Sequence, residues 1–337
     1  MKSNLLDKLQ RPLRDLRISV TDRCNFRCVY CMPEELFKSG YTFMPSEQML
    51  SFDEIVRTAK LFVRLGVKKI RLTGGEPLLR KDLPALIKEL HNIEGLEDIG
   101  LTTNGSLLKK FAKDLYTAGL RRITVSLDSL DAERFSMING HRCKLTTVMD
   151  GIHAALNVGM IVKINMVVKK GQNEEDIIPM AKFCKQHKLI LRFIEYMDVG
   201  NSNGWQLEEV VTKQQILNKL NEQMPVKQIK ENYTGEVATR YQYLNSSQEI
   251  GIISSVTDTF CATCSRIRLS ADGKLYTCLF ASAGHDLRSL IRSEQNDDII
   301  INKISQIWNG RHDRYSEERS NLSIKQKKKI EMSSIGG

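Results

Sequence analysis

Short runs rich in apolar and β-branched residues alternate with longer stretches in which apolar residues recur every three or four positions, from residue 16 to about residue 197. The short runs predict strands, and the longer stretches predict amphipathic helices between them. The predicted strands are 16–20, 69–72, 98–101, 122–126, 162–168 and 191–196, and the predicted helices are 53–65, 82–91, 107–118, 145–158 and 174–186. This alternation predicts βαβ units and a parallel sheet.

Six strand–helix units are too few for a closed eight-stranded barrel. We therefore predict an α/β fold built as an incomplete, TIM-like (β/α)6 barrel, and the pattern leaves a doubly wound sheet open as the alternative. Residues 200–204 are rich in glycine and asparagine and predict a turn-rich linker. Beyond it we predict a helix at 212–223, strands near 238–244 and 251–254, and mostly helical sequence to the end.

The chain has 337 residues, of which 41% are hydrophobic, which is enough for a large core. We predict a partial barrel at 1–200 and a C-terminal α+β region at 201–337. No apolar run reaches the roughly 18 residues that span a membrane, and the first ten residues lack a signal-peptide core, so we expect a soluble cytoplasmic protein. The net charge of +10 suits an anionic partner but selects none, and the basic run at 325–329 predicts a solvated helix face.

Eight cysteines in a chain expected in the cytoplasm indicate metal binding or catalysis rather than disulfides. Cys24, Cys28 and Cys31 form a CxxxCxxC motif just after the first predicted strand. Iron–sulfur clusters usually have four cysteine ligands, so three thiolates on a four-iron cluster leave one iron open. A zinc site is the alternative, although the motif contains no histidine. Cys143 and Cys184 fit no motif and are expected to be structural thiols.

A second cysteine group consists of Cys261, Cys264 and Cys278. It again offers three cysteines and no obvious fourth, so a second iron–sulfur cluster and a zinc knuckle completed by His285 both remain open. Arg266 and Arg268 follow the first two of these cysteines and point to the same face if they lie on a strand. Paired guanidiniums suit phosphates, whereas two exposed strand arginines are the alternative.

Polar motifs follow the ends of the predicted strands, where the chemistry of a (β/α) barrel gathers. They are the Gly-Gly-Glu-Pro motif at 74–77, the segments 102–105, 126–129 and 195–198, and Lys163 with Asn165 in the fifth strand. Glycine lets a ligand approach the backbone closely, and Glu76 can accept a hydrogen bond from an ammonium. Alone, the Gly-Gly-Glu-Pro motif is equally compatible with a tight strand-to-helix connection. The barrel fold predicts that these motifs share one rim.

Together the motifs resemble the GTP 3′,8-cyclase family of the radical S-adenosylmethionine (SAM) superfamily, over essentially the whole chain. The resemblance rests on the CxxxCxxC motif with Tyr30 before its last cysteine, the Gly-Gly-Glu-Pro motif, the late cysteines with Arg-x-Arg, and the terminal Gly336-Gly337. It implies formation of (8S)-3′,8-cyclo-7,8-dihydroguanosine 5′-triphosphate from GTP, the first step of molybdenum cofactor biosynthesis. In that reaction a 5′-deoxyadenosyl radical removes hydrogen from C3′, and C3′ then bonds to C8 of guanine.

The resemblance also implies the site residues. Two [4Fe-4S] clusters are implied, one on Cys24, Cys28 and Cys31 and the other on Cys261, Cys264 and Cys278. The implied SAM contacts are Tyr30, Gly75, Glu76, Ser126 and Met197, and the implied GTP contacts are Arg17, Arg71, Thr102, Lys163, Arg266, Ile267 and Arg268. Most of these GTP contacts are cationic, which suits a triphosphate. In this family Gly336-Gly337 is expected to reach the active site, whereas fraying is the usual behaviour of a terminus.

The expected partners also follow from the resemblance. They are GTP, a low-potential electron donor, the downstream enzyme cyclic pyranopterin monophosphate synthase, and a second copy of the chain in a homodimer. We expect neither nucleic acid nor a membrane as a partner. The open alternatives are a peptide-modifying or RNA-modifying radical SAM enzyme and a non-catalytic zinc scaffold. Peptide-modifying enzymes typically carry a longer C-terminal cysteine array, and the sequence contains no recognisable RNA-binding module.

Overall fold

The computed structural model describes residues 5–38, 40–293, 295–320 and 328–336. Its centre is a curved sheet in which six parallel strands are neighbours in chain order. These strands are β1 (Asp15–Ser19), β2 (Lys69–Thr73), β3 (Asp98–Thr103), β4 (Arg122–Ser126), β5 (Ile161–Val168) and β6 (Ile190–Glu195). Each begins and ends within two residues of its predicted position, so the six-strand pattern is confirmed.

Strands that follow residue 200 extend both edges of this sheet. Beyond β6 come β9 (Glu249–Ile253), β8 (Thr239–Tyr243) and β7 (Val226–Gln228), and beyond β1 come β10 (Arg266–Leu269), β11 (Lys274–Tyr276) and β12 (His285–Asp286). β9 and β10 run parallel to their barrel neighbours, and the outer strands run antiparallel. The sheet does not close in the described part of the chain, which confirms the incomplete barrel. A domain boundary at residue 200 remains a prediction.

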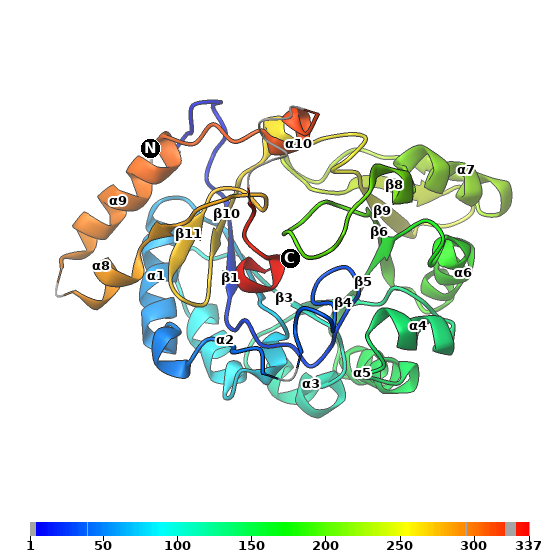
Figure 1. The fold of residues 1–337 in the computed structure, drawn as a ribbon, viewed down its shortest axis with the longest axis horizontal. Coiled ribbons are helices and arrows are strands. Elements are labelled where there is room, and N and C mark those ends of the chain that lie inside the picture. Colours follow the sequence, from blue (N-terminus) through cyan, green and yellow to red (C-terminus); the bar gives the residue numbers. More distant parts are fainter. Residues whose placement is uncertain (1–4, 39, 294, 321–327, 337) are drawn as a thin grey trace.

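Helices cover the convex outer side of the sheet (Figure 1). They are α1 (Phe52–Arg64), α2 (Leu83–His91), α3 (Leu108–Thr117), α4 (Ala132–Ile138), α5 (Leu145–Asn157), α6 (Ile177–Gln186) and α7 (Lys213–Gln223), with α8 (Arg288–Arg292) and α9 (Asp297–Asn309) packed against α1. Two short helices do not belong to this layer: α10 (Tyr315–Glu318) lies beside residues 261–263, and α12 (Met332–Ile335) lies on the inner side of the sheet beside β1. Residues before two helices explain where they begin. At α1 the Ser51 hydroxyl accepts from the Glu54 N–H, and the Glu54 carboxylate accepts from the Ser51 N–H. Thr212 and Gln215 form the same pair of bonds at α7. The short helix α4 was not predicted.

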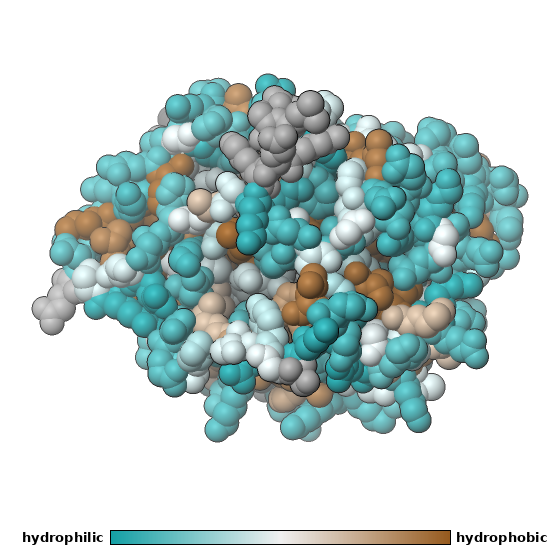
Figure 2. All heavy atoms as spheres, in the orientation of Figure 1, coloured by the Kyte–Doolittle hydropathy of each residue, from teal (hydrophilic) through white to brown (hydrophobic). Residues whose placement is uncertain are grey.

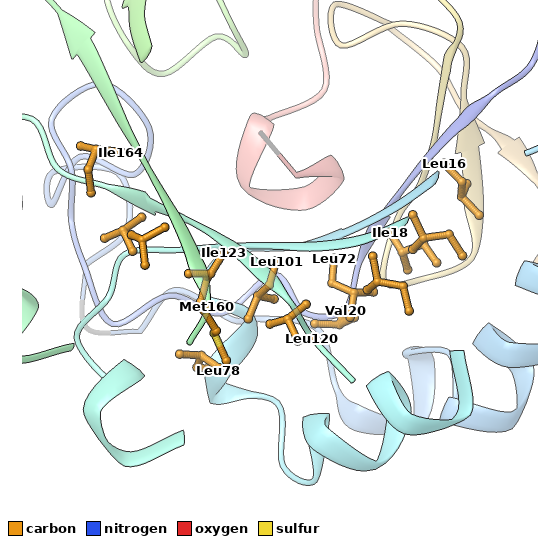
Figure 3. Packing of buried hydrophobic residues seen from close by; sticks show 14 of the residues in the cluster. Leu16, Ile18, Val20, Leu72, Leu78, Leu101, Leu120, Ile123, Met160 and Ile164 are labelled. Atoms are coloured by element: carbon orange, nitrogen blue, oxygen red, sulfur yellow. The ribbon is translucent and has the colours of Figure 1, made fainter. Parts of the chain in front are cut away.

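The hydrophobic core lies between the sheet and the surrounding helices. Figure 3 shows Ile18, Leu72, Leu101 and Ile123 in this layer, and each is at most 1% exposed. Successive strand residues point to opposite faces, so the residues between these apolar side chains point into the barrel interior. Burial of the outer face therefore fixes which polar residues face inward.

The face of the molecule in Figure 2 is mostly hydrophilic, with apolar residues in small separate groups. Within the described ranges, no helix has the length and apolar character needed to cross a membrane. In the basic run at 325–329, residues 325–327 lie outside the described residues. The predicted solvated helix face is wrong at Lys329, which is not helical. Its side chain is 9% exposed because its ammonium lies 2.7 Å from the Asp198 carboxylate.

Candidate active site

A cavity of about 310 Å³ at the carboxyl ends of the barrel strands contains most of the predicted site residues. It is lined by both cysteine groups and by Arg17, Tyr30, Arg71, Gly75, Thr102, Ser126, Met197, Arg266 and Arg268. Three predicted residues, Glu76, Lys163 and Ile267, do not line it. The prediction that motifs after different strands meet at one rim is therefore confirmed for most of them.

The loop that carries the first cysteines is held by a side chain that sequence reasoning missed. The Arg27 guanidinium donates to the carbonyl oxygens of Cys24 at 2.9 Å, Phe26 at 2.8 Å and Phe37 at 3.2 Å. Burial raises the pKa of Cys24 to about 11 and that of Cys31 to about 12. These groups are therefore neutral thiols near pH 7 unless a metal displaces their protons.

The geometry of the two cysteine groups favours clusters over zinc. Among the described residues, no three His, Cys, Asp or Glu side chains are arranged to hold a single metal ion. Ligands of a four-iron cluster bind different irons, so their sulfurs need only face a common space. His285, the candidate fourth zinc ligand, is exposed on the edge strand β12 and does not line the cavity. Three thiols that line a cavity, with no fourth protein ligand evident in the part of the chain that the structure describes, fit an iron–sulfur cluster with one open iron.

The glycines after β2 allow two backbone segments to touch. A β-carbon on Gly75 would lie 2.3 Å from the Arg23 carbonyl oxygen, and one on Gly74 would lie 2.5 Å from that of Thr21. The Gly75 N–H donates to the Thr21 carbonyl at 2.8 Å, and the Glu76 N–H donates to that of Arg23 at 2.7 Å. The Gly-Gly-Glu-Pro motif is thus the backbone support of the cysteine loop, and any larger residue at Gly75 displaces that loop.

Glu76 is fully buried and is satisfied by the protein. Its carboxylate accepts from the Leu78 N–H at 3.0 Å, the Thr103 hydroxyl at 2.7 Å and the Asn104 N–H at 2.7 Å. Burial raises its pKa to about 7. The side chain links the loops after β2 and β3, and the SAM contact expected of it remains a prediction.

Tyr30 is oriented by a carboxylate at the end of β4. Its hydroxyl donates to Asp128 at 2.6 Å, and Asp128 also accepts from the Val167 N–H at 2.8 Å. Burial raises the pKa of Asp128 to about 6. Asp128 therefore ties the cysteine loop to β4 and β5, beside Ser126 and Met197 on the cavity wall.

Five cations gather on the inner face of the sheet. Strand register places Arg268, Arg17 and Arg71 side by side on β10, β1 and β2, and Lys163 and Arg192 lie on β5 and β6. We call these five residues the cationic strip. None of them is paired with a carboxylate among the described residues. Sequence reasoning missed Arg192 as a site residue, although its place on the inner face of a predicted strand was a usable signal.

Burial and mutual repulsion lower the pKa values along the cationic strip. Burial, followed by the charges of Arg268 and Arg71, lowers the pKa of Arg17 well below its ordinary value. Burial and neighbouring arginines lower the pKa of Arg71 to about 9, of Arg268 to about 10 and of Lys163 to about 7. Buried cations without counter-ions are costly, so this interior is suited to a ligand that carries several negative charges.

Within the Arg-x-Arg segment, the side chains of Ile267 and Arg268 point to opposite faces of β10. Arg268 is 5% exposed, so the alternative of a surface arginine does not apply to it. Ile267 is fully buried in the core, because it faces the other side of β10. Only its backbone is available for the GTP contact that the resemblance implied. Thr102 lines the cavity and accepts a hydrogen bond from Arg71 at 3.2 Å.

Guanidiniums also surround the second cysteine group. Arg266 and Arg311 donate to the Cys264 sulfur at 3.1 Å and 3.2 Å. Burial raises the pKa of Cys264, but the positive charges of Arg266 and Arg311 outweigh it and lower that pKa to about 6. Cys143 and Cys184 lie outside the cavity, and Cys184 is buried in the core.

The C-terminal segment reaches the cavity wall. Arg268 donates to the carbonyl oxygen of Gly336, and a β-carbon on Gly336 would lie 2.1 Å from Thr73 Cγ2. The φ of Gly336 is +74°, in the region that favours glycine. Gly336 is therefore packed in place rather than frayed, and Gly337 lies outside the described residues.

Comparisons with known proteins agree with this site. The profile of the Radical SAM superfamily matches residues 18–184, and the profile named Molybdenum Cofactor Synthesis C matches residues 189–317. The crystal structure of Streptococcus suis SuiB bound to S-adenosylmethionine has a TM-score of 0.58 at 16% identity and covers 92% of this chain and 68% of that chain. A second crystal structure of Streptococcus suis SuiB has a TM-score of 0.56 at 16% identity and covers 89% of this chain and 67% of that chain. The fold and the site define a radical SAM enzyme, which uses SAM and iron–sulfur clusters.

Curated relatives narrow this class to one family. The GTP 3′,8-cyclase of Staphylococcus haemolyticus is 51% identical over 340 residues, which cover 100% of both chains. The GTP 3′,8-cyclases of Staphylococcus carnosus and of Staphylococcus aureus strain MRSA252 are 50% and 49% identical over the same full length. The chain belongs to the GTP 3′,8-cyclase family.

Proposed function

We propose that this chain converts GTP to (8S)-3′,8-cyclo-7,8-dihydroguanosine 5′-triphosphate, with cleavage of SAM to 5′-deoxyadenosine and methionine. This reaction begins molybdenum cofactor biosynthesis. The observation that carries the proposal is that two cysteine triads and an unpaired cationic strip line or border one cavity. A triphosphate supplies the negative charges that the strip lacks, and membership of the family supports GTP as the nucleotide.

The cysteine triads fit the two clusters that the reaction requires. Cys24, Cys28 and Cys31 would hold the SAM-binding [4Fe-4S] cluster, and Cys261, Cys264 and Cys278 would hold the second. When bound, the first cluster and SAM supply the radical that removes hydrogen from C3′ of the ribose. The chain contributes position and exclusion of water, with Tyr30, Gly75, Ser126 and Met197 around SAM and Glu76 behind the loop.

We assign the triphosphate to the cationic strip. Arg17, Arg71, Lys163 and Arg268 belong both to the strip and to the implied GTP contacts, and Arg192 is added from the structure. The remaining implied contacts are Arg266, Thr102 and the Ile267 backbone. Guanidiniums hold phosphate oxygens in a forked geometry, so several of them fix the ribose relative to SAM.

We further propose that the enzyme works in the cytoplasm as a homodimer. A low-potential donor supplies its electrons, and the product passes to cyclic pyranopterin monophosphate synthase. These partners rest on the family alone.

An anaerobic assay tests the proposed reaction. Reconstituted protein is mixed with SAM, a strong reductant and each of the four nucleoside triphosphates in turn, and mass spectrometry follows 5′-deoxyadenosine and modified nucleotides. We expect a cyclised product from GTP only. Cleavage of SAM with every nucleotide unchanged would refute GTP as the substrate while leaving the radical SAM class intact.

We expect GTP binding at pH 8 to be accompanied by uptake of up to about one proton, of which Lys163 accounts for the larger part. Burial, followed by the charges of Arg192 and Arg122, lowers the pKa of Lys163 from 10.5 to about 7. Phosphate next to the amine raises that pKa again. Calorimetry in two buffers of different ionisation enthalpy measures the uptake, which decreases in Lys163→Met but not in the exposed control Lys60→Met.

The same group makes the substrate-free protein more stable as pH rises. Below pH 7 Lys163 is charged in both folded and unfolded chains, and between pH 7 and 10.5 it is charged mainly in the unfolded chain. The unfolded state then binds more protons, so the free energy of unfolding increases with pH across this window.

For the calorimetry, equal proton uptake on GTP binding in the parent and in Lys163→Met would contradict the assignment of Lys163 to the phosphate site.

A further inference from the structure

Three side chains form a buried charge network behind the second cysteine group: Asp7, Arg11 and Arg311. Their side chains are 0%, 1% and 2% exposed. The Asp7 carboxylate accepts from Arg11 Nε at 2.6 Å and from Arg311 Nη1 at 3.2 Å. It also accepts from the backbone N–H groups of Leu9 and Arg11, each at 2.9 Å. One buried carboxylate therefore fixes two guanidiniums, and the half-exposed carboxylate of Asp313 lies 3.5 Å from Arg311 Nε on the other side.

The network holds the backbone at each of the three cysteines. Arg11 donates to the Cys261 carbonyl oxygen at 2.8 Å, and Arg311 donates to the Cys264 carbonyl oxygen at 2.7 Å. Arg311 Nε donates to the Thr277 carbonyl at 3.1 Å, which is the peptide group that precedes Cys278. The N-terminal segment and the chain just after α9, which Figure 1 shows near each other, therefore set the spacing of this cysteine group.

Arg311 is itself fixed in orientation. Its guanidinium carbon lies 4.6 Å from the centre of the Trp308 ring, and Trp308 is fully buried. The Trp308 ring N–H donates to the Arg11 carbonyl oxygen at 3.1 Å. The end of α9 and the N-terminal segment thus hold Arg311 against Cys264, where its Nη2 donates to the sulfur.

The two cysteine groups differ in the hydrogen-bond donors that reach their sulfurs. Within the described residues, the first group has no guanidinium donor to a sulfur: Cys24 Sγ accepts from the Phe26 N–H at 3.4 Å and from Asn104 at 3.9 Å. The Cys264 sulfur instead accepts from the guanidiniums of both Arg266 and Arg311. Charge and hydrogen bonds at cluster sulfurs stabilise the reduced, more negative form of a cluster and so raise its reduction potential.

We propose that Arg311 is a positioning residue for the second cluster. Within the network, it holds the three cysteines in place for cluster binding and raises the reduction potential of the bound cluster. The inference rests on the proposed function, because it requires a cluster on Cys261, Cys264 and Cys278.

The test uses the full chain with Cys24, Cys28 and Cys31 all replaced by alanine, so that only the second group can bind iron. In this background we expect about four irons per chain. Arg311→Gln lowers the iron content and shifts the midpoint potential of the remaining cluster downward, because a positive charge is lost. Arg311→Lys keeps the positive charge but not the planar set of guanidinium donors. Its midpoint potential is therefore closer to that of the parent than the potential of Arg311→Gln, while a chelator still removes its iron faster than from the parent.

Two further variants separate charge from mere structural support. Asp7→Asn removes a negative charge from the same network and shifts the midpoint potential upward, opposite to Arg311→Gln. Arg314→Gln removes a positive charge from the same segment at a side chain that is 47% exposed, and it leaves iron and potential at the parent values because solvent screens that charge. A purely structural role would give no opposite shifts.

The outcomes are distinguishable. Parent iron content and potential in Arg311→Gln would overturn the inference and leave the proposed function standing. Absence of iron from the background with Arg311 intact would overturn the second cluster of the proposed function, and the inference with it. If Arg311→Gln does not fold, Arg311→Lys still decides, since a parent-like chelation rate in that variant contradicts the positioning role.

Discussion

The Cys24→Ala variant is expected to form no 5′-deoxyadenosine from SAM above the background of an assay without enzyme. Cys24 is one of only three thiols that the first group turns toward the cavity. A four-iron cluster with one iron already open to SAM then has only two protein thiolates, which do not retain it. We expect the iron content to fall from about eight to about four per chain. Anaerobic assay with mass spectrometry measures the nucleoside, and a colorimetric assay measures iron.

Two other cysteine variants give this prediction its controls. Cys143→Ala removes a half-buried thiol outside both groups and should keep the iron content and SAM cleavage of the parent. Cys261→Ala should lose a similar amount of iron to Cys24→Ala but should still cleave SAM, because the first group is intact. Formation of 5′-deoxyadenosine by Cys24→Ala at the parent rate would show that the cluster assignment is wrong.

Local pattern was sufficient to predict the barrel strands and the rim. The alternation that buries Ile18 and Leu72 also directs Arg17 and Arg71 inward, so periodicity alone placed the strands and the residues between them. The motifs after the strands then meet because the carboxyl ends of parallel strands share one side of a barrel.

Pairings between distant parts of the chain were not predictable in this way. Nothing in the sequence near β9 and β10 says that one extends the β6 edge and the other the β1 edge. Because β10 lies beside β1, Arg268 lies beside Arg17, and the second cysteine group lines the same cavity as the first. The contacts of Arg311 with Asp7 depend on the same long-range arrangement, and neither residue belongs to a sequence motif.

The orientation of some single side chains could not be predicted from the sequence, for physical reasons that the structure makes plain. Ile267 belongs to the Arg-x-Arg segment, but strand alternation turns its side chain into the core. Glu76 follows two glycines that line the cavity, and its carboxylate accepts from the Leu78 N–H of its own loop and from the Thr103 hydroxyl and the Asn104 N–H at the end of β3. Arg27 occupies a variable position of the CxxxCxxC motif, so the motif does not single it out. Its role depends on three backbone carbonyl oxygens that only the folded loop brings together.

Arg17→Met is expected to weaken GTP binding roughly 10- to 100-fold, because a hydrogen bond to a charged group contributes about 1.5–3 kcal/mol. Arg17 has no carboxylate partner among the described residues and lies between Arg71 and Arg268 in register. GTP would therefore be its main counter-charge. Equilibrium binding of GTP to the anaerobic, reconstituted protein measures the loss.

The same substitution should leave the substrate-free protein as stable as the parent or more stable. Burial and the charges of Arg268 and Arg71 lower the pKa of Arg17, which shows that the folded state disfavours the charged form at this position. Replacing such a group with a side chain of similar length removes repulsion and desolvation cost, while the methylene groups continue to fill the space. Thermal unfolding without nucleotide tests this part of the prediction.

Together the two measurements separate a binding residue from a structural one. GTP stabilises the folded protein according to its affinity and concentration, so added GTP should raise the unfolding temperature of the parent more than that of Arg17→Met. Arg14→Met is the matched control, because Arg14 is an exposed arginine just before β1 that does not line the cavity. A less stable Arg17→Met with parent GTP affinity would mean that Arg17 supports the fold and that the anion binds elsewhere. A stable variant with weakened GTP binding would mean that the fold bears the repulsion along the cationic strip to bind the triphosphate.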